Sequence, residues 1–263
     1  MMVGIIGCGQ IGGSIALKLS ETDDVDLVIY DKDPETLELL KNRIPKAIVA
    51  NDQREILEDE RLDFLILAIP IGECIKMLER EEFLSSYILM DVCSVKGIIM
   101  DTANKRNLRF IGGHPIAGNE RMGPDGWDKE MFKQRKFCVC KGVGVLDGDL
   151  KKSIDLIERL EAMFYEINPQ DHDELLGYTS HMTYLVSLAL RLTCEDHSAL
   201  AGPGYQSTTR VGRQNPNMSL EILKFNKENV LNSLEKFKES LNDLERVIEH
   251  EDWEKFLKLA GGG

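Results

Sequence analysis

The chain has 263 residues, of which 43% are hydrophobic and 29% charged, a composition typical of globular proteins rather than disordered ones. Its net charge of -13 argues against nucleic acid as the main partner, because phosphate binding needs a basic surface. The six cysteines show no metal-binding spacing, so we expect no metal site. We find no pattern typical of a signal peptide and no apolar run that approaches the roughly 20 residues needed to span a bilayer. We therefore expect a cytoplasmic protein without membrane contact.

The first 31 residues predict a strand, a tight turn, a helix and a second strand. An apolar run over residues 2–7 leads into the pattern Gly-x-Gly-x-x-Gly. The first glycine allows the turn, the second lets a pyrophosphate approach, the third lets helix pack on strand, and amides of the helix start face the phosphates. An acid at the end of the second strand accepts hydrogen bonds from the ribose of NAD and repels the 2′-phosphate of NADP. We therefore predict that NAD is bound by Gly7, Gly9, Gln10, Ile11, Gly12 and Asp31; the alternative is a glycine turn beside a helix-capping Asp31.

Apolar runs then alternate with helical stretches, as in a parallel sheet that helices cover on both faces. Strands are expected at residues 2–7, 27–30, 64–69, 87–92, 108–111, 137–140 and 164–167. Ligands bind at the carboxyl ends of strands in open α/β sheets, so Pro70, Ser94 and His114 should meet over the nicotinamide. Ser94 is a candidate hydrogen-bonding partner of His114 or the cofactor, and equally a candidate N-cap of the helix after it.

His114 is the centre of the segment Ile111 to Gly118, Ile-Gly-Gly-His-Pro-Ile-Ala-Gly. Its glycine and proline neighbours place the imidazole on a non-helical backbone that other groups can approach. Histidine has the side-chain pKa nearest neutrality, so His114 can accept a proton at working pH. The alternative is a turn histidine at the end of a strand.

The pattern changes at Asn168-Pro169, after which only helical periods follow. We therefore predict an α/β fold, with a Rossmann-type parallel-sheet dinucleotide-binding domain over residues 1–168 and an all-helical domain over residues 169–263. His181 shares a face with leucines on a helix expected over residues 173–192, which suits a core histidine as well as a functional one. A loop expected over residues 199–210 ends in Arg210, which with nearby Arg213 forms a concentrated positive charge.

Apolar residues from Val230 to Ile248 recur at spacings of three and four. The pattern predicts one amphipathic helix over residues 219–250, roughly 48 Å long at 1.5 Å per residue. This helix is longer than the core of its own domain requires, so we expect a homodimer through the C-terminal helices. The alternative is a helix packed within one chain.

Taken together, these segments make the chain similar to the prephenate dehydrogenase family, which includes arogenate dehydrogenase. The resemblance spans nearly the whole length. It is carried by Gly7-x-Gly9-x-x-Gly12, by Asp91-Val92-Cys93-Ser94-Val95-Lys96, by Gly112-Gly113-His114-Pro115-Ile116-Ala117-Gly118-Asn119-Glu120, by Ser180-His181, by the segment from Gly202 to Arg210, and by Asn215-Pro216.

The resemblance implies NAD-dependent oxidative decarboxylation of prephenate to 4-hydroxyphenylpyruvate, in tyrosine biosynthesis. It implies that His114 is the catalytic base, that Ser94 hydrogen-bonds it near the nicotinamide, and that Arg210 holds a substrate carboxylate. Glu120 matches a position at the site entrance. His181 and Tyr184 fall at substrate-binding positions, although many members have a second histidine where this chain has Tyr184, and an aromatic residue where it has Ser219. No separate regulatory domain is expected.

Prephenate and arogenate differ in one group, a ketone in the first and an ammonium in the second, and an ammonium that leaves water needs a carboxylate partner. In the family, the segment matching residues 199–206 borders the substrate, and here it contains no acidic residue, which favours prephenate. Three alternatives remain. The first is arogenate dehydrogenase. The second is a different NAD-dependent hydroxy-acid or imine reductase, which would not need the His-Pro segment, and the third is a non-catalytic NAD-responsive binding protein.

Overall fold

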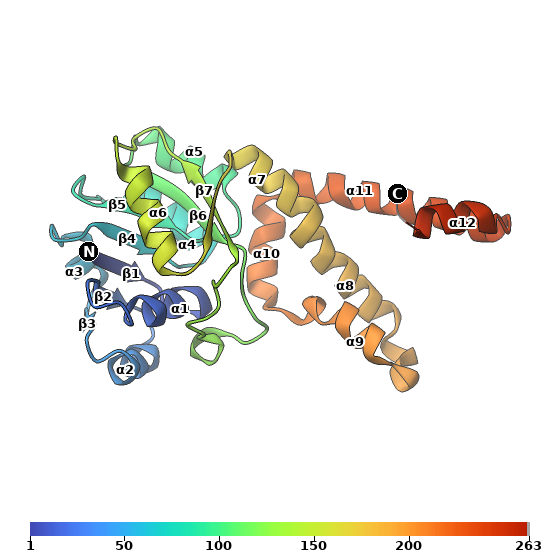
Figure 1. The fold of residues 1–263 in the computed structure, drawn as a ribbon, viewed down its shortest axis with the longest axis horizontal. Coiled ribbons are helices and arrows are strands. Elements are labelled where there is room, and N and C mark those ends of the chain that lie inside the picture. Colours follow the sequence, from blue (N-terminus) through green and yellow to red (C-terminus); the bar gives the residue numbers. More distant parts are fainter. Residues whose placement is uncertain (262–263) are drawn as a thin grey trace.

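The computed structural model describes residues 1–261, so residues 262 and 263 of the expected second domain lie outside it. Within the described residues, eight strands form one sheet in the order β3-β2-β1-β4-β5-β6-β7-β8, and a helical part follows (Figure 1). The strands are β1 Met2–Ile6, β2 Asp26–Tyr30, β3 Ile48–Val49, β4 Phe64–Leu67, β5 Ile88–Asp91, β6 Phe110–Pro115, β7 Lys136–Lys141 and β8 Met163–Glu166. All neighbouring strands are parallel except β6 and β7.

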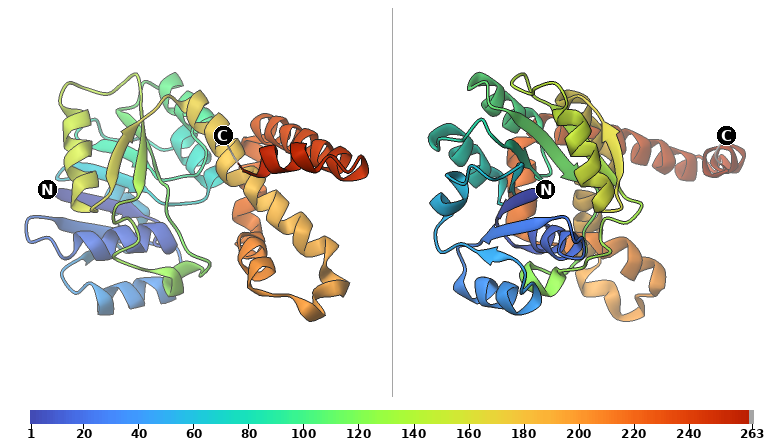
Figure 2. Two further views of the ribbon diagram at one scale, coloured as in Figure 1. Left: turned by 45° about the vertical axis from the view of Figure 1, so that its right-hand side comes forward. Right: turned by 60° about the vertical axis from the view of Figure 1, so that its left-hand side comes forward.

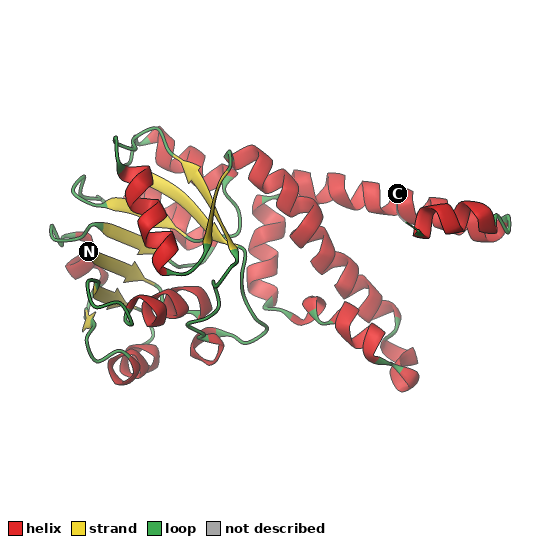
Figure 3. Cartoon of the chain, in the orientation of Figure 1, coloured by secondary structure: helices red, strands yellow, loops and turns green. Residues whose placement is uncertain are grey.

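Successive residues of the central strands face opposite sides of the sheet and so build two cores. In β4, Phe64 and Ile66 belong to one core, whereas Leu65 and Leu67 belong to the other. Helices α1 Gln10–Leu19, α2 Pro34–Arg43 and α6 Asp149–Arg159 contribute to the first core, and α3 Gln53–Leu57, α4 Ile71–Arg80 and α5 Gly97–Lys105 to the second. The sheet therefore lies between two layers of helices (Figure 3).

Each predicted strand is present, and two features of the sheet differ from the prediction. Strand β6 continues past residue 111, so His114 lies inside a strand, where it is in register with Cys138 of the antiparallel β7. The pairing with β7 extends β6 through a segment that its glycines and proline mark as a turn. The strand β3 was not predicted, because its two residues are too few to form a recognisable apolar run.

The helical part begins three residues after β8. Its helices are α7 Pro169–Leu176, α8 Met182–Thr193, α9 Pro203–Thr209, α10 Pro216–Phe225, α11 Lys227–Glu249 and α12 Trp253–Ala260. A π-helical turn, Gly177–His181, joins α7 to α8, and short 3-10 turns at Glu195–Leu200 and Val211–Arg213 flank α9.

Two predictions for this part are wrong. The single helix expected over residues 219–250 is broken at Asn226, which separates α10 from α11. The Asn226 side chain donates to the Asp173 carbonyl at 2.7 Å and contacts His181 Nδ1 at 3.0 Å. These contacts tie Asn226 to the neighbouring helices at the point where the expected helix is broken. The loop expected over residues 199–210 contains helix α9, which begins at Pro203, a residue suited to the first turn of a helix.

The helical part contacts the sheet domain through α7, which packs against α5, and through α10, which packs against α4. Helices α8 and α9 extend away from the sheet, and α11 and α12 form an arm that also projects from the body of the molecule (Figure 2). Across residues 1–261, none of the helices has the length and apolar character needed to cross a bilayer.

Candidate active site

The glycine turn after β1 has the geometry of a phosphate-binding loop. Gly7 has φ +93°, a left-handed conformation that favours glycine, and a Cβ on Gly12 would lie 2.0 Å from the Gly7 carbonyl oxygen. A Cβ on Gly9 would meet no atom within 4 Å, so the backbone there is open to a ligand. No side chain caps the first amides of α1, where Gln10 and Ile11 lie. The turn therefore fits a pyrophosphate.

Asp31 lies beside this turn at the end of β2. Its Oδ2 accepts the Cys8 N–H at 2.6 Å and its Oδ1 accepts the Asp33 N–H at 2.9 Å. Asp31 does not cap the following helix, because Asp33 accepts the amides of Glu35 and Thr36 in that role. The helix-capping alternative for Asp31 is therefore wrong.

The segment after β6 packs against the glycine turn, a contact that the sequence did not reveal. The Gln10 amide donates to Asn119 Oδ1 at 2.8 Å, and the Trp127 indole N–H donates to the Cys8 and Gly9 carbonyls, each at 2.9 Å. The side chain of Gln10 is thus bound to protein, which leaves its backbone amide as the group that can face a phosphate. Pro70 is exposed directly before α4, at the same edge of the sheet.

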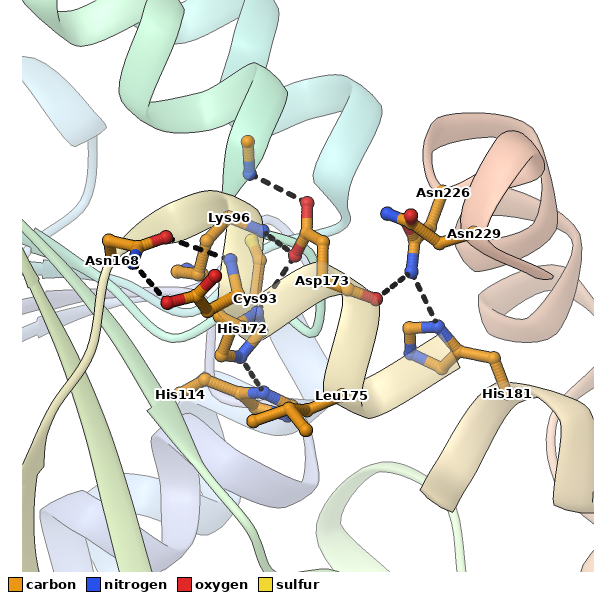
Figure 4. A network of polar contacts seen from close by, with 12 residues as sticks. Cys93, Lys96, His114, Asn168, His172, Asp173, Leu175, His181, Asn226 and Asn229 are labelled. Atoms are coloured by element: carbon orange, nitrogen blue, oxygen red, sulfur yellow. Dashed lines mark hydrogen bonds and ion pairs between the residues drawn. The ribbon is translucent and has the colours of Figure 1, made fainter. Parts of the chain in front are cut away.

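His114 is 9% exposed, and its Nδ1 lies 2.9 Å from Nε2 of His172 on α7 (Figure 4). The two rings meet edge to face, with centroids 5.1 Å apart. The other ring nitrogen of His114, Nε2, makes no hydrogen bond to residues 1–261 and is not among the fully buried unpartnered atoms. His114 Nε2 is therefore the atom that a ligand can reach.

Asp173 continues this chain of contacts. Its Oδ1 lies 2.8 Å from Nδ1 of His172, and its two oxygens accept the backbone amides of Lys96 and Gly97, each at 2.7 Å. The carboxylate of α7 thus caps helix α5, so the N-cap interpretation of Ser94 is wrong. Ser94 is half-buried, and the structure gives its hydroxyl no hydrogen bond within the described chain, to His114 or to any other residue.

A buried ion pair supports the backbone next to His114. Lys96 pairs with Asp91, and its Nζ also donates to the Gly113 carbonyl at 2.7 Å. Asp91 Oδ1 accepts the Gly113 N–H at 3.2 Å. Burial alone would lower the pKa of Lys96, but the Asp91 carboxylate raises it above its ordinary value, so Lys96 is a fixed positive charge near His114.

The pKa of His114 lies well below its usual 6.5. Burial is the largest cause, and His172, Lys96 and His181 also disfavour a positive charge on the ring. The imidazole is therefore neutral at neutral pH and has a lone pair that can take a proton.

His181 ends the π-helical turn and is 3% exposed. Its Nδ1 faces the Asn226 amide, while its Nε2 is buried and has no partner in the part of the chain that is described. Burial lowers the pKa of His181 to about 4, so the ring is neutral. Tyr184 is buried one turn later on α8. His181 is thus packed among core residues and still holds a free polar atom.

Arg210 and Glu120 form an ion pair that joins the end of α9 to the segment after β6. Both side chains are exposed. The segment over residues 199–206, expected to border the substrate, lies at the far end of α8 and α9 from the sheet (Figure 1), and its Leu200 is 97% exposed. Within one chain, this segment does not border His114.

The sequence interpretation missed His172, Asp173 and Asn226. A local signal for the first two exists, since His172 and Asp173 are an adjacent imidazole and carboxylate in the first helix after the change of pattern at Asn168. Asn226 offers no such signal, because its role appears only when α10 and α11 pack beside α7.

Two family models match the chain. The model described as "Prephenate dehydrogenase, nucleotide-binding domain" matches residues 15–166, and the one described as "Prephenate dehydrogenase, dimerization domain" matches residues 168–261. The chain belongs to the prephenate dehydrogenase family. It is an NAD-dependent oxidoreductase of that family, which confirms the resemblance and the cofactor that the sequence predicted.

The prephenate dehydrogenase of Lactococcus lactis is 26% identical over 262 residues, 94% of this chain and 71% of that protein. The structure of prephenate dehydrogenase from Aquifex aeolicus in complex with hydroxyphenyl propionate and NAD+ is 26% identical, with a TM-score of 0.87 over 99% of this chain and 95% of that one. Arogenate dehydrogenase from Synechocystis is 25% identical, with a TM-score of 0.81 over 99% and 96%. The predicted fold class, a Rossmann-type domain followed by a helical one, is confirmed.

Proposed function

We propose that this chain catalyses the NAD-dependent oxidative decarboxylation of prephenate to 4-hydroxyphenylpyruvate, with His114 as the catalytic base. The observation that carries the proposal is the state of His114, a neutral imidazole whose Nδ1 is held by His172 and whose Nε2 is free. A base in this position suits the oxidation of an alcohol beside a nicotinamide.

Prephenate has a hydroxyl on C4 of a cyclohexadiene ring and a carboxylate on C1. His114 Nε2 takes the proton of the hydroxyl as the C4 hydrogen departs with its electron pair. The bound nicotinamide supplies the acceptor for that hydride. The bond between C1 and its carboxylate then breaks, carbon dioxide leaves, and the electron pair of that bond completes an aromatic ring with a phenolate oxygen on C4. The protonated His114 returns its proton to this oxygen, which gives the phenol. The residues mainly have to orient the substrate and accept one proton, a base contributing typically 10²- to 10⁴-fold.

Arg210 is the proposed partner of a substrate carboxylate. In a chain of charge -13, a local cation is needed to attract a dianion, and charge-assisted hydrogen bonds contribute roughly 1.5–3 kcal/mol each. The pairing of Arg210 with Glu120 supports this role, because Arg210 is exposed and already holds a carboxylate. The substrate would replace Glu120.

His181, Tyr184 and Ser94 complete the proposed site. Because Asn226 Oδ1 accepts from Asn229, the Asn226 nitrogen donates to His181 Nδ1, and the proton of His181 therefore lies on Nε2. A buried N–H without a partner is costly, so we assign His181 Nε2 to a substrate oxygen. The Tyr184 and Ser94 hydroxyls are proposed to donate to substrate and cofactor.

The preference for prephenate rests on how the nearby carboxylates are used. Among residues 1–261, the carboxylates that the contacts place around this site are all engaged: Asp173 binds two amides and His172, Asp91 pairs with Lys96, and Glu120 pairs with Arg210. None is left for the ammonium of arogenate, whose desolvation without a partner is costly. We expect kcat/KM for prephenate to exceed that for arogenate by about tenfold or more, or about 1.4 kcal/mol.

The test is an assay of nicotinamide reduction with prephenate and arogenate, each with NAD+ and NADP+. The proposal predicts the fastest turnover with prephenate and NAD+, because Asp31 favours a ribose without a 2′-phosphate. Equal or better turnover of arogenate would overturn the substrate assignment. NAD+ binding without turnover of either acid would favour a non-catalytic binding protein instead.

A homodimer through the C-terminal helices is part of the proposal. The arm carries exposed apolar side chains on one face of α11, namely Leu241, Leu244 and Ile248. An apolar stripe of this kind on a projecting helix marks an interface. The match of this region to a model described as a dimerization domain supports a second copy of the chain as the partner.

A further inference from the structure

A carboxylate stands at one end of a hydrogen-bonded chain that reaches His114 (Figure 4). Asp173 accepts the amides of Lys96 and Gly97, and its Oδ1 lies 2.8 Å from Nδ1 of His172. An ionised carboxylate accepts hydrogen bonds and donates none. The proton of this contact therefore belongs to Nδ1 of His172.

The position of the proton on His172 determines the position of the proton on His114. With this single N–H on its ring, His172 has its Nε2 atom left as an acceptor. Nδ1 of His114 lies 2.9 Å from it and must donate. The proton of His114 then lies on Nδ1, and its lone pair lies on Nε2, the atom that a ligand can reach.

We infer that His172, oriented by Asp173, is a positioning residue that holds His114 in the tautomer with a free Nε2 lone pair. The inference rests on the proposed role of His114 as the base. In the other tautomer Nε2 carries a hydrogen and cannot take the substrate proton. The wrong tautomer of a catalytic histidine lowers kcat by about 10⁴ in a serine protease, so the choice matters for the rate.

The same carboxylate joins the two parts of the molecule. Asp173 lies on α7 of the helical part and caps α5 of the sheet domain. Docking of the helical part therefore brings His172 to His114 and sets the tautomer in one step. His172 acts through His114 alone, because its two ring nitrogens are both occupied.

The tautomer can be observed directly in the full-length protein. In protein with 15N-labelled histidine, the NMR signals of the two ring nitrogens show which nitrogen carries hydrogen. The signals of His114 are those that disappear in His114→Asn. We expect Nδ1 protonated and Nε2 unprotonated in the wild type at neutral pH. A proton on Nε2 of His114, or a doubly protonated His172, overturns the inference, whether or not the protein turns over prephenate.

Two variants with side chains of similar length distinguish a role of His172 in positioning His114 from a role in stability alone. His172→Gln places an amide oxygen near the former Nε2, whereas His172→Met offers no comparable acceptor. We expect His172→Met to lose at least about tenfold in kcat and to show His114 partly protonated on Nε2, with NAD+ affinity unchanged. His172→Gln should restore the Nδ1 tautomer and most of kcat. Equal kcat in the two variants, with the His114 tautomer unchanged, contradicts the inference.

Tyr87→Phe is the matched control for loss of a buried hydrogen bond. The Tyr87 hydroxyl is bound to Leu57 and Leu84, in the second core, away from the network around His114. The Tyr87→Phe substitution should lower the stability of the protein without changing the His114 tautomer or kcat. Should His172→Met not fold, the wild-type and His172→Gln spectra still decide the question. Failure of the proposed function would appear separately, as absence of turnover in the wild type.

Discussion

At the scale of residues, Arg210 is the group whose removal should change substrate binding alone. Arg210→Ala takes away the proposed partner of the carboxylate, so KM for prephenate should rise about tenfold or more while the dissociation constant of NAD+ stays constant, since charge-assisted hydrogen bonds contribute roughly 1.5–3 kcal/mol. Steady-state kinetics and a cofactor titration measure both. Arg213→Ala removes the same charge three residues later and should leave KM within about twofold; similar KM values in the two variants would refute the role of Arg210.

The buried histidines should make the protein less stable in mild acid. The pKa of His181 falls from about 6.5 in the unfolded chain to about 4 in the folded one, so between these values the unfolded state binds more protons. The free energy of unfolding then decreases as pH falls from 6.5 toward 4, by up to about 1.4 kcal/mol per pH unit for this group. The effect fades as pH rises through 6.5 and is absent well above it.

Urea unfolding at several pH values measures this dependence. His181→Gln replaces the titrating imidazole by an amide, which does not titrate. The unfolding free energy of this variant should therefore vary less steeply with pH than that of the wild type between pH 4 and 6.5. Parallel curves for the two proteins would mean that His181 is not held neutral by burial.

The residues that sequence reasoning could identify belong to local motifs. The glycine turn, Asp31 and His114 each carry their signal within a few positions of the chain. The contacts of His114 with His172 and of Lys96 with Asp173 join residues 58 and 77 positions apart, so they depend on how the two parts of the molecule dock. No local periodicity contains that information.

At the scale of elements, Glu221 of α10 should stabilise the contact between the two parts. Its carboxylate accepts the amides of Ile71 at 2.8 Å and Gly72 at 3.2 Å, at the N-terminus of α4. A negative charge there caps free amides and complements the helix dipole, so Glu221→Gln should lower the unfolding free energy by about 0.5–2 kcal/mol. Chemical denaturation measures the change.

Glu79→Gln is the matched control, because it makes the same chemical change at an exposed position on α4. Its effect should stay within about 0.5 kcal/mol. If Glu221→Gln is no more destabilising than this control, Glu221 is not a clamp between the parts.

Element boundaries were predictable where one period ran undisturbed. The strands of the sheet and most of α1 follow from continuous apolar runs and the glycine turn. The break at Asn226 and the π-helical turn at Gly177–His181 were not predictable from local patterns. Asn226 lies before the apolar period of residues 230–248 begins, and the π-helical turn falls within the helix expected over residues 173–192. Side-chain contacts across helices, such as Asn226 with His181, become visible only in the fold.

At the scale of the whole molecule, the projecting arm should be buried in a homodimer. Sedimentation at micromolar concentration should give a mass of twice the 29.7 kDa of one chain. Leu241→Glu places a charge on the apolar stripe, where Leu241 is 53% exposed in one chain, and should dissociate the dimer. Lys238→Glu, on the same helix at an exposed polar position, should not. A wild-type mass near 29.7 kDa would exclude a stable dimer.

The neutral His114, which lies between the nucleotide-binding and helical parts, is the proposed base of the reaction. Its role can be measured as the turnover of prephenate by His114→Asn, with NAD+ binding determined on the same preparation. Asparagine can hydrogen-bond the substrate hydroxyl but cannot take its proton, so we predict unchanged NAD+ affinity and a kcat lowered at least about a hundredfold. A kcat near that of the wild type, in a variant that still binds NAD+, would exclude His114 as the base.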